Sequence, residues 1–269
     1  MRSSGWFVRF KPNRAAAVRL FCLHYAGGNS TAFHGWAESL AEAVELIAIE
    51  LPGRRTRFRE VPLESAAAII EPLYREVRPL LERPFVLFGY SIGALLAYEL
   101  ARKLEAAGDP MPLELIVCAA RAPHLPRVQR NVAQFGLDEW RELLVSFDGI
   151  APEVLRDDEL MSVLIPMLKA DFNVGHTYSE PARQPLCCPV TAFGGRRDTW
   201  VSEAELAAWR SATRARFEYE LFDGGHFFLK SHRAELLQHL RQRLEACLAE
   251  VRSGAATLRA DSAAAGRRP

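Results

Sequence analysis

Residues 89–93 read Gly-Tyr-Ser-Ile-Gly, and they stand between an apolar run at 85–88 and a helix-forming segment that begins at Ala94. This order predicts a strand, a sharp turn and a helix, with Ser91 at the apex of the turn. Small residues on both sides let neighbouring backbone approach closely, so the hydroxyl stands clear at the end of a sheet. The motif predicts a nucleophilic serine, although a serine that only caps the following helix would satisfy the same pattern.

A serine hydroxyl is a weak nucleophile at neutral pH, so it needs an imidazole to take its proton and a carboxylate to orient that imidazole. In folds with this serine turn, the order along the chain is serine, acid, histidine. His226 follows a late strand-like run at 217–222 and is preceded by two glycines, which makes it the predicted base. His24 and His124 also follow strand-like runs, but His24 precedes the serine and His124 lies in a proline-flanked loop.

Asp198 is the predicted acid. It lies in the loop after the strand-like run 189–194, at the edge of the sheet where open α/β folds place their chemistry. The preceding strand-like run, 115–119, is followed by no carboxylate, which removes the other usual position. Two alternatives stay open: Asp198 is a solvated carboxylate paired with a neighbouring arginine, or Asp223 in the histidine loop is the acid.

The oxyanion that forms when a serine attacks a carbonyl needs two preorganised backbone N–H donors, and losing one typically costs about 2.7–4 kcal/mol. Ile92, the residue after the nucleophile, is the expected first donor. The second should come from a loop after an early strand, and the run 18–23 leads into such a loop with the pair Gly27-Gly28. We predict Ala26 as this donor, with an ordinary glycine turn as the alternative.

Length and composition fit one large α/β domain. The chain has 269 residues, 49% of them hydrophobic, which is enough for a large core, and its formal net charge of +1 disfavours a nucleic-acid-binding protein. No apolar run approaches the roughly 20 residues that span a bilayer, and the N-terminus lacks the apolar core of a signal peptide. We expect a cytoplasmic protein with no membrane partner. Neither a phosphate-binding glycine loop nor a metal-ligand spacing occurs, so we expect no cofactor and no metal.

Strand-like runs alternate with helical patterns, which predicts a mostly parallel sheet with helices on both faces. The expected strands lie near 6–10, an edge strand, and near 18–23, 44–49, 85–89, 115–119, 189–193 and 217–221, and the expected helices at about 32–43, 63–82, 91–107, 202–214 and 226–250. The interval from about 126 to 185 contains only helix-like segments, and we expect a helical lid there that contributes to an acyl pocket. We expect the domain to cover 1–252 and to be followed by a disordered tail at 253–269.

Five motifs occur in order along the chain: Ala26-Gly27-Gly28, Leu51-Pro52-Gly53-Arg54, Gly89-Tyr90-Ser91-Ile92-Gly93, Gly194-Gly195 with Asp198, and Gly224-Gly225-His226-Phe227-Phe228-Leu229. Together they resemble the stand-alone type II thioesterases of polyketide and nonribosomal peptide biosynthesis. The resemblance implies an α/β-hydrolase fold and the editing hydrolysis of aberrant or stalled acyl groups through a Ser-His-Asp triad and an acyl-enzyme. It implies acyl or peptidyl carrier protein domains of a synthase as partners, and a phosphopantetheine arm that belongs to the carrier-bound substrate.

Two residues depart from the family pattern. Tyr90 stands before the serine where the family usually has His, and Tyr25 stands where a His often precedes Ala-Gly-Gly. Neither position supplies a member of the triad, so we expect altered pocket polarity rather than lost activity.

Four arginines follow the third expected strand, at Arg54, Arg55, Arg57 and Arg59. Carrier proteins are generally acidic, so this cluster could dock one, while an ordinary solvated face is the alternative.

Three rival interpretations remain. A small-molecule carboxylesterase would use the same triad, and a terminal cyclising thioesterase domain is related but normally fused to a synthase, whereas this chain begins at Met1. A noncatalytic binding module would have no need of all three triad residues.

Overall fold

The structure is a computed structural model that describes residues 5–126, 132–147, 152–180 and 184–254. Within these residues, seven strands form one sheet in the order β1-β3-β2-β4-β5-β6-β7. They are β1 (Phe7–Val8), β2 (Val18–Leu23), β3 (Val44–Ile49), β4 (Phe85–Tyr90), β5 (Glu114–Cys118), β6 (Val190–Gly195) and β7 (Phe217–Phe222). At the edge, β1 is antiparallel to β3, and all other pairs are parallel. The expected mostly parallel sheet is therefore confirmed.

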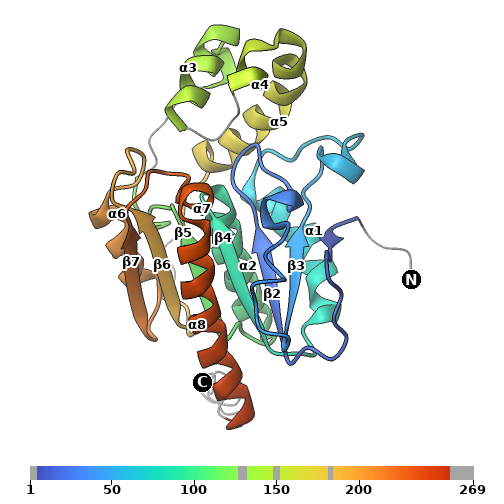
Figure 1. Ribbon diagram of the computed structural model, residues 1–269, viewed down its shortest axis with the longest axis vertical. Helices are drawn as coiled ribbons and strands as arrows, with labels where there is room; N and C mark the ends of the chain where they lie inside the picture. The colour runs from blue at the N-terminus through green and yellow to red at the C-terminus, as the bar shows by residue number, and fades with distance from the viewer. Residues whose placement is uncertain (1–4, 127–131, 148–151, 181–183, 255–269) are drawn as a thin grey trace.

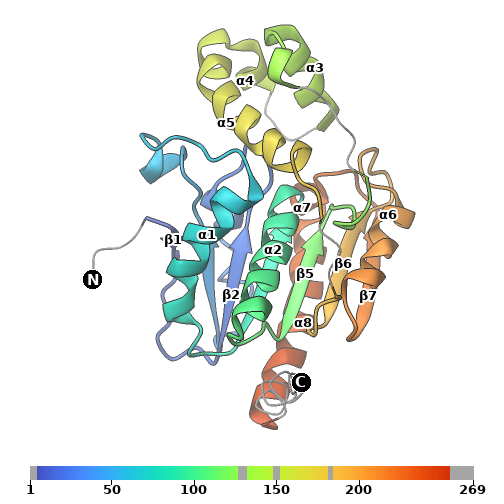
Figure 2. The same cartoon turned by 180° about the vertical axis from the view of Figure 1, so that it is seen from behind.

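Helices cover both faces of this sheet. They are α1 (Ala66–Val77), α2 (Ile92–Ala107), α3 (Leu137–Phe147), α4 (Pro152–Arg156), α5 (Asp158–His176), α6 (Glu203–Ala207), α7 (Phe228–Ser231) and α8 (Arg233–Arg252). Figure 1 shows α8 across one face, and Figure 2 shows α1 and α2 across the other. Strands β2 to β6 are buried along their whole length, which explains why their sequences are nearly continuous apolar runs.

The expected helix at about 32–43 is wrong. The structure has only a short 3-10 helix there, η1 (Ser30–Phe33), followed by turns. Gly35 has a φ of 75°, a left-handed conformation that does not continue an α-helix. The ring of Trp36 packs edge-on against Phe88 in β4, with 5.4 Å between the centroids. Burial of this ring against the sheet therefore overrides the local helical pattern.

The other expected helical regions contain helices, but three of them are divided. The first continues from α1 into the 3-10 helix η3 (Arg78–Leu80), and another continues from α6 into η5 (Ala208–Ala212). The last is split into α7 and α8 at His232, whose backbone is not helical. These interruptions shorten the helices without moving them from their places in the alternation.

Between β5 and β6, helices α3, α4 and α5 form a helical insertion that lies beyond the carboxyl ends of the central strands (Figures 1 and 2). Its helices share an apolar cluster of their own around the buried Trp140 and Met161, distinct from the two clusters on the faces of the sheet. The insertion is thus a small second layer at the carboxyl end of the sheet. The expected disordered tail lies outside the described residues from 255 onward.

Candidate active site

Ser91 lies in the turn between β4 and α2. Its φ of 54° is rare for a residue with a side chain, and such strain costs of order 1–3 kcal/mol, so the surrounding structure must hold it. Both flanking glycines are required sterically, because a Cβ at Gly89 would collide with the backbone of Gly93, and one at Gly93 with the backbone of Leu23. The Ser91 side chain makes no capping hydrogen bond to α2, so the helix-cap alternative is wrong.

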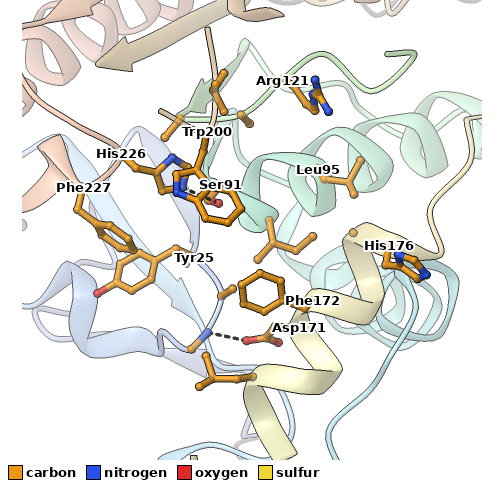
Figure 3. A pocket seen from close by; sticks show the side chains of 18 of the residues that line it. Tyr25, Ser91, Leu95, Arg121, Asp171, Phe172, His176, Trp200, His226 and Phe227 are labelled. Carbon is orange, nitrogen blue, oxygen red and sulfur yellow. Dashed lines mark hydrogen bonds between the residues drawn. The ribbon is translucent and has the colours of Figure 1, made fainter. Parts of the chain in front are cut away.

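The structure brings the three predicted residues into one hydrogen-bonded chain. Nε2 of His226 lies 3.1 Å from Oγ of Ser91, and Nδ1 of His226 lies 2.8 Å from Oδ2 of Asp198 (Figure 3). The Asp198 side chain is fully buried, and its Oδ1 accepts the N–H groups of Trp200 and Val201 at 2.8 and 3.1 Å. The carboxylate is therefore fixed from both sides, with one oxygen left for the imidazole.

The alternative acid lies elsewhere. Asp223 is exposed and forms an ion pair with Arg197 at 2.6 Å, in the loop that precedes His226. Arg197 therefore pairs with Asp223 and not with Asp198, so both alternatives for Asp198 lose their support.

The two competing histidines also lie outside the site. His24 is buried at the start of the loop after β2, where desolvation, with a further contribution from the Arg54 charge, lowers its pKa to about 3. It is neutral at physiological pH, and its Nδ1 is hydrogen-bonded to the carbonyl of Tyr25 at 2.9 Å. His124 is exposed and contacts the hydroxyl of Ser211.

Both predicted oxyanion donors line the same cavity as Ser91. Ile92 is the first residue of α2, so its N–H has no partner within the helix. In the loop after β2, the N–H of Gly27 donates to Asp171 at 2.8 Å and that of Gly28 to the carbonyl of Tyr25 at 2.9 Å. Within the described residues the N–H of Ala26 has no such partner, and Ala26 lines the cavity, so this amide can bind a ligand there.

The cavity above Ser91 has a volume of about 270 Å³ and a mostly apolar wall. The insertion contributes Leu144 from α3 and both Leu168 and Phe172 from α5, as expected for an acyl pocket. Trp200 covers the serine side, and Arg121 and His176 bring polar groups to another part of the wall (Figure 3). Other apolar residues of the insertion pack into its own cluster instead: Val132, Trp140, Leu143, Leu155 and Met161. This shape suits a ligand with an apolar chain next to a reactive carbonyl.

The expectation that Tyr90 alters pocket polarity is wrong, because Tyr90 is fully buried and does not line the cavity. Its hydroxyl donates to the carbonyl of His226 at 2.6 Å and accepts the N–H of Leu229 at 3.3 Å. Tyr25 does line the cavity, with its ring edge-on to Phe227 at 4.8 Å. The residue before the serine therefore holds the backbone of the histidine loop, a role that the sequence motif did not indicate.

The docking role expected for the four arginines is wrong for two of them. Arg54 is 3% exposed and pairs with Asp171 on α5, and Arg57 is 7% exposed and lies over the ring of Trp6. Neither guanidinium can face a partner protein. Arg55 and Arg59 are exposed.

The described residues contain no group of three or more His, Cys, Asp or Glu side chains that could hold a metal ion. Among the same residues, no helix is long and apolar enough to cross a membrane.

Comparison with known proteins agrees with this fold. A solved structure of the thioesterase RedJ, from the prodiginine pathway of Streptomyces coelicolor, is 35% identical, with a TM-score of 0.80 over 85% of this chain and 91% of RedJ. The type II thioesterase BorB, from the borrelidin biosynthetic cluster, is 34% identical, with a TM-score of 0.83 over 91% of this chain and 99% of BorB. The expected class, an α/β-hydrolase fold, is therefore confirmed.

The family model described as the thioesterase domain matches residues 18–244. The gramicidin S biosynthesis protein GrsT of Aneurinibacillus migulanus is 38% identical over 244 residues, which cover 91% of this chain and 95% of GrsT. The chain belongs to the thioesterase family, whose members hydrolyse thioesters. The resemblance to the type II thioesterases of polyketide and nonribosomal peptide pathways is confirmed as well.

Proposed function

We propose that this protein is an editing thioesterase that removes aberrant or stalled acyl groups from carrier proteins of a polyketide or nonribosomal peptide pathway. The observation that carries the proposal is the chain of hydrogen bonds from Ser91 through His226 to Asp198, at the base of an apolar cavity. Family membership and the pathway names of its relatives support the thioester substrate. Because that substrate is attached to a synthase, the proposal places the enzyme with the synthase in the cytoplasm.

In the proposed mechanism, Oγ of Ser91 attacks the thioester carbonyl while Nε2 of His226 takes its proton. Asp198 holds Nδ1–H of the imidazole and stabilises the imidazolium that forms. The N–H groups of Ala26 and Ile92 stabilise the oxyanion. The intermediate collapses to an acyl-serine, and His226 gives its proton to the departing phosphopantetheine sulfur.

The second half repeats these proton transfers with water. His226 takes a proton from a water molecule, whose oxygen attacks the acyl-serine, and then returns the proton to Oγ of Ser91. The products are a free carboxylic acid and the carrier thiol. Every step uses protein groups and water, so the proposed mechanism requires no cofactor, and phosphopantetheine enters only as part of the substrate.

The helical insertion is the proposed lid. Leu144, Leu168 and Phe172 form part of the cavity wall, so an acyl chain lies between the insertion and the sheet. Hydrogen exchange tests gating: the amides of α3 to α5 should exchange faster than those of β2 to β5, and an acyl phosphonate on Ser91 should slow them. Equal protection in the free enzyme, unchanged by the phosphonate, would contradict the lid.

Acidic carrier domains are the proposed partners. The guanidinium of Arg55 donates to Oγ of Ser30 at 2.8 Å and pairs with the buried Glu50 at 3.6 Å, so the remaining docking candidate is Arg59, which follows a 61% exposed Phe58 in the loop after β3. An exposed aromatic residue next to a cation suits an acidic partner with an apolar contact.

The deciding experiment compares one acyl group on four leaving groups: a carrier protein, coenzyme A, a short thiol and a simple alcohol. We expect the highest kcat/KM with the carrier protein and the lowest with the alcohol, and no turnover by Ser91→Ala. Faster hydrolysis of the oxygen ester would favour a small-molecule carboxylesterase. Binding of the acyl carrier without turnover would favour a noncatalytic module.

A further inference from the structure

Asp171 projects from α5 of the insertion toward the loop after β2. It is only 3% exposed and forms part of the cavity wall. Its Oδ2 accepts the N–H of Gly27 at 2.8 Å, and its Oδ1 pairs with Nη2 of Arg54 (Figure 3 shows the first contact). One buried carboxylate therefore contacts both the predicted oxyanion loop and a cation beneath it.

Arg54 extends this contact to two more backbone groups. Its Nε donates to the carbonyl of Gly28 and its Nη1 to the carbonyl of Pro52, both at 2.9 Å. The planar guanidinium thus joins the oxyanion loop, the segment after β3 and helix α5. The ion pair and the backbone groups bonded to it thus come from three separate parts of the chain.

These contacts restrain the loop on the carboxyl side of Ala26. The bond to Gly27 fixes the peptide plane between residues 26 and 27, and the bond from Arg54 fixes the plane between residues 28 and 29. The N–H of Ala26 lies in the preceding plane, whose carbonyl, that of Tyr25, accepts the N–H of Gly28 at 2.9 Å. The two held planes are therefore linked through this turn to the direction of the Ala26 N–H. Helix α5 lies close above, since a Cβ on Gly27 would be 2.7 Å from Cδ2 of Leu168.

The charges of Asp171 and Arg54 compensate each other next to the predicted oxyanion loop. An unpaired carboxylate this close to a developing oxyanion would raise its energy, whereas Arg54 neutralises Asp171 through a direct ion pair. A buried ion pair is by itself weak evidence for stability, because apolar residues often replace such a pair at no loss. Apolar residues in place of Asp171 and Arg54 could not make the hydrogen bonds that position the loop.

We propose that Asp171 and Arg54 are positioning residues, which hold the Ala26 N–H in place for the oxyanion only while α5 is seated on the loop. The inference rests on the proposed serine mechanism. It makes the position of the insertion a condition for transition-state stabilisation as well as for substrate access.

The test compares two ketone inhibitors that carry the same acyl chain. A trifluoromethyl ketone adds Oγ of Ser91 and becomes an oxyanion, whereas the matching methyl ketone binds without forming one. In Asp171→Asn and Arg54→Lys, we expect affinity for the trifluoromethyl ketone to fall about 10- to 100-fold, below the full loss of one donor. Affinity for the methyl ketone should change less than about threefold, and kcat should fall while KM stays near the parent value.

A matched control is the buried pair of Arg19 and Glu45, which joins the opposite, amino-terminal ends of β2 and β3 at 3.3 Å. Glu45→Gln should lower the melting temperature as Asp171→Asn does, without changing the ratio of the two ketone affinities. Arg54→Lys keeps the positive charge, but an ammonium group cannot donate to all three acceptors of Arg54, so the affinity for the trifluoromethyl ketone should still fall. It also gives a second variant if Asp171→Asn does not fold.

Equal losses for both ketones, or an unchanged ratio in the folded variants, would overturn the positioning role. Mass spectrometry of the parent enzyme separates this from a failure of the proposed function. If the parent forms no adduct between the trifluoromethyl ketone and Ser91, the serine mechanism fails and the inference fails with it. If the parent adduct forms and the variants keep the parent ratio, only the positioning role fails.

Discussion

The histidine loop and the oxyanion loop are held by different parts of the molecule. The carbonyl of His226 is bonded to Tyr90 at the end of β4, inside the core of the sheet. The oxyanion loop is bonded to Asp171, which belongs to the insertion. The proposed proton-transfer residue His226 is therefore supported by the core of the sheet, whereas the proposed oxyanion loop is supported by a layer with a small core of its own. An enzyme arranged in this way can lose rate when its insertion shifts, even though the proton-transfer residues stay in place.

The largest expected effect lies on the core side. Asp198→Asn should lower kcat about 10⁴-fold, because an amide at this position favours the wrong imidazole tautomer. Asp223→Asn is the matched control, since the Asp223 side chain is exposed and, among the described residues, pairs with Arg197 alone. It should change kcat less than about twofold, which steady-state kinetics on one thioester would show. A larger loss in the Asp223 variant would move the acid to the histidine loop.

Tyr90→Phe tests the support of the histidine loop from the core. The change removes the hydroxyl that donates to the carbonyl of His226, so we expect about 1–3 kcal/mol lower free energy of unfolding. We also expect about a tenfold lower kcat, because His226 is then held less well. Tyr98→Phe is the control, since it also removes a hydroxyl from a buried ring but one bonded to Glu180, away from that loop. Equal kcat values for both variants would show that the Tyr90 hydroxyl does not position His226.

His24 tests the oxyanion side by pH. Its folded pKa of about 3 lies below the usual 6.5, so between these values the unfolded chain binds a proton that the folded protein refuses. This contribution is absent above pH 6.5, and it lowers stability as the pH falls below that value. From pH 7.5 to 5.5, denaturant unfolding of the parent should lose about 1.4 kcal/mol more than that of His24→Asn. Equal losses would show that His24 is not held neutral by its burial at the start of this loop.

The smallest expected effect concerns the surface. Arg59→Glu should raise KM about threefold for a carrier-bound acyl group and weaken its dependence on salt, because an exposed charge acts mainly on encounter. Hydrolysis of the same acyl group on a short thiol should not change. Arg241→Glu on α8, an exposed arginine on another part of the surface, is the control. A loss on both substrates would indicate that Arg59 supports the pocket rather than docking.

Most of the site was predictable because its residues follow strands. Ser91 and Asp198 each come after a buried apolar strand, and His226 follows the largely exposed edge strand β7. Parallel strands bring their carboxyl ends to one edge. The helix expected at 32–43 failed for a local reason, since Gly35 and Trp36 are used for packing on the sheet.

The positioning contacts were not predictable from the sequence. Arg54 and Asp171 are 117 residues apart, and a run of arginines in a sequence looks the same whether it is solvated or buried. Tyr90 was noticed only as a departure from the family pattern, and its partner, His226, lies 136 residues away.

By itself, the sequence determined the alternating fold, the chain order of serine, acid and histidine, and the family, because strand ends and tight turns depend on local residue types. Only the tertiary structure decided which arginines are buried, which amide of the oxyanion loop is left for a ligand, and that the insertion holds that loop. The physical reason is that burial and hydrogen-bond partners across more than a hundred residues are settled when elements pack, and no local pattern records them.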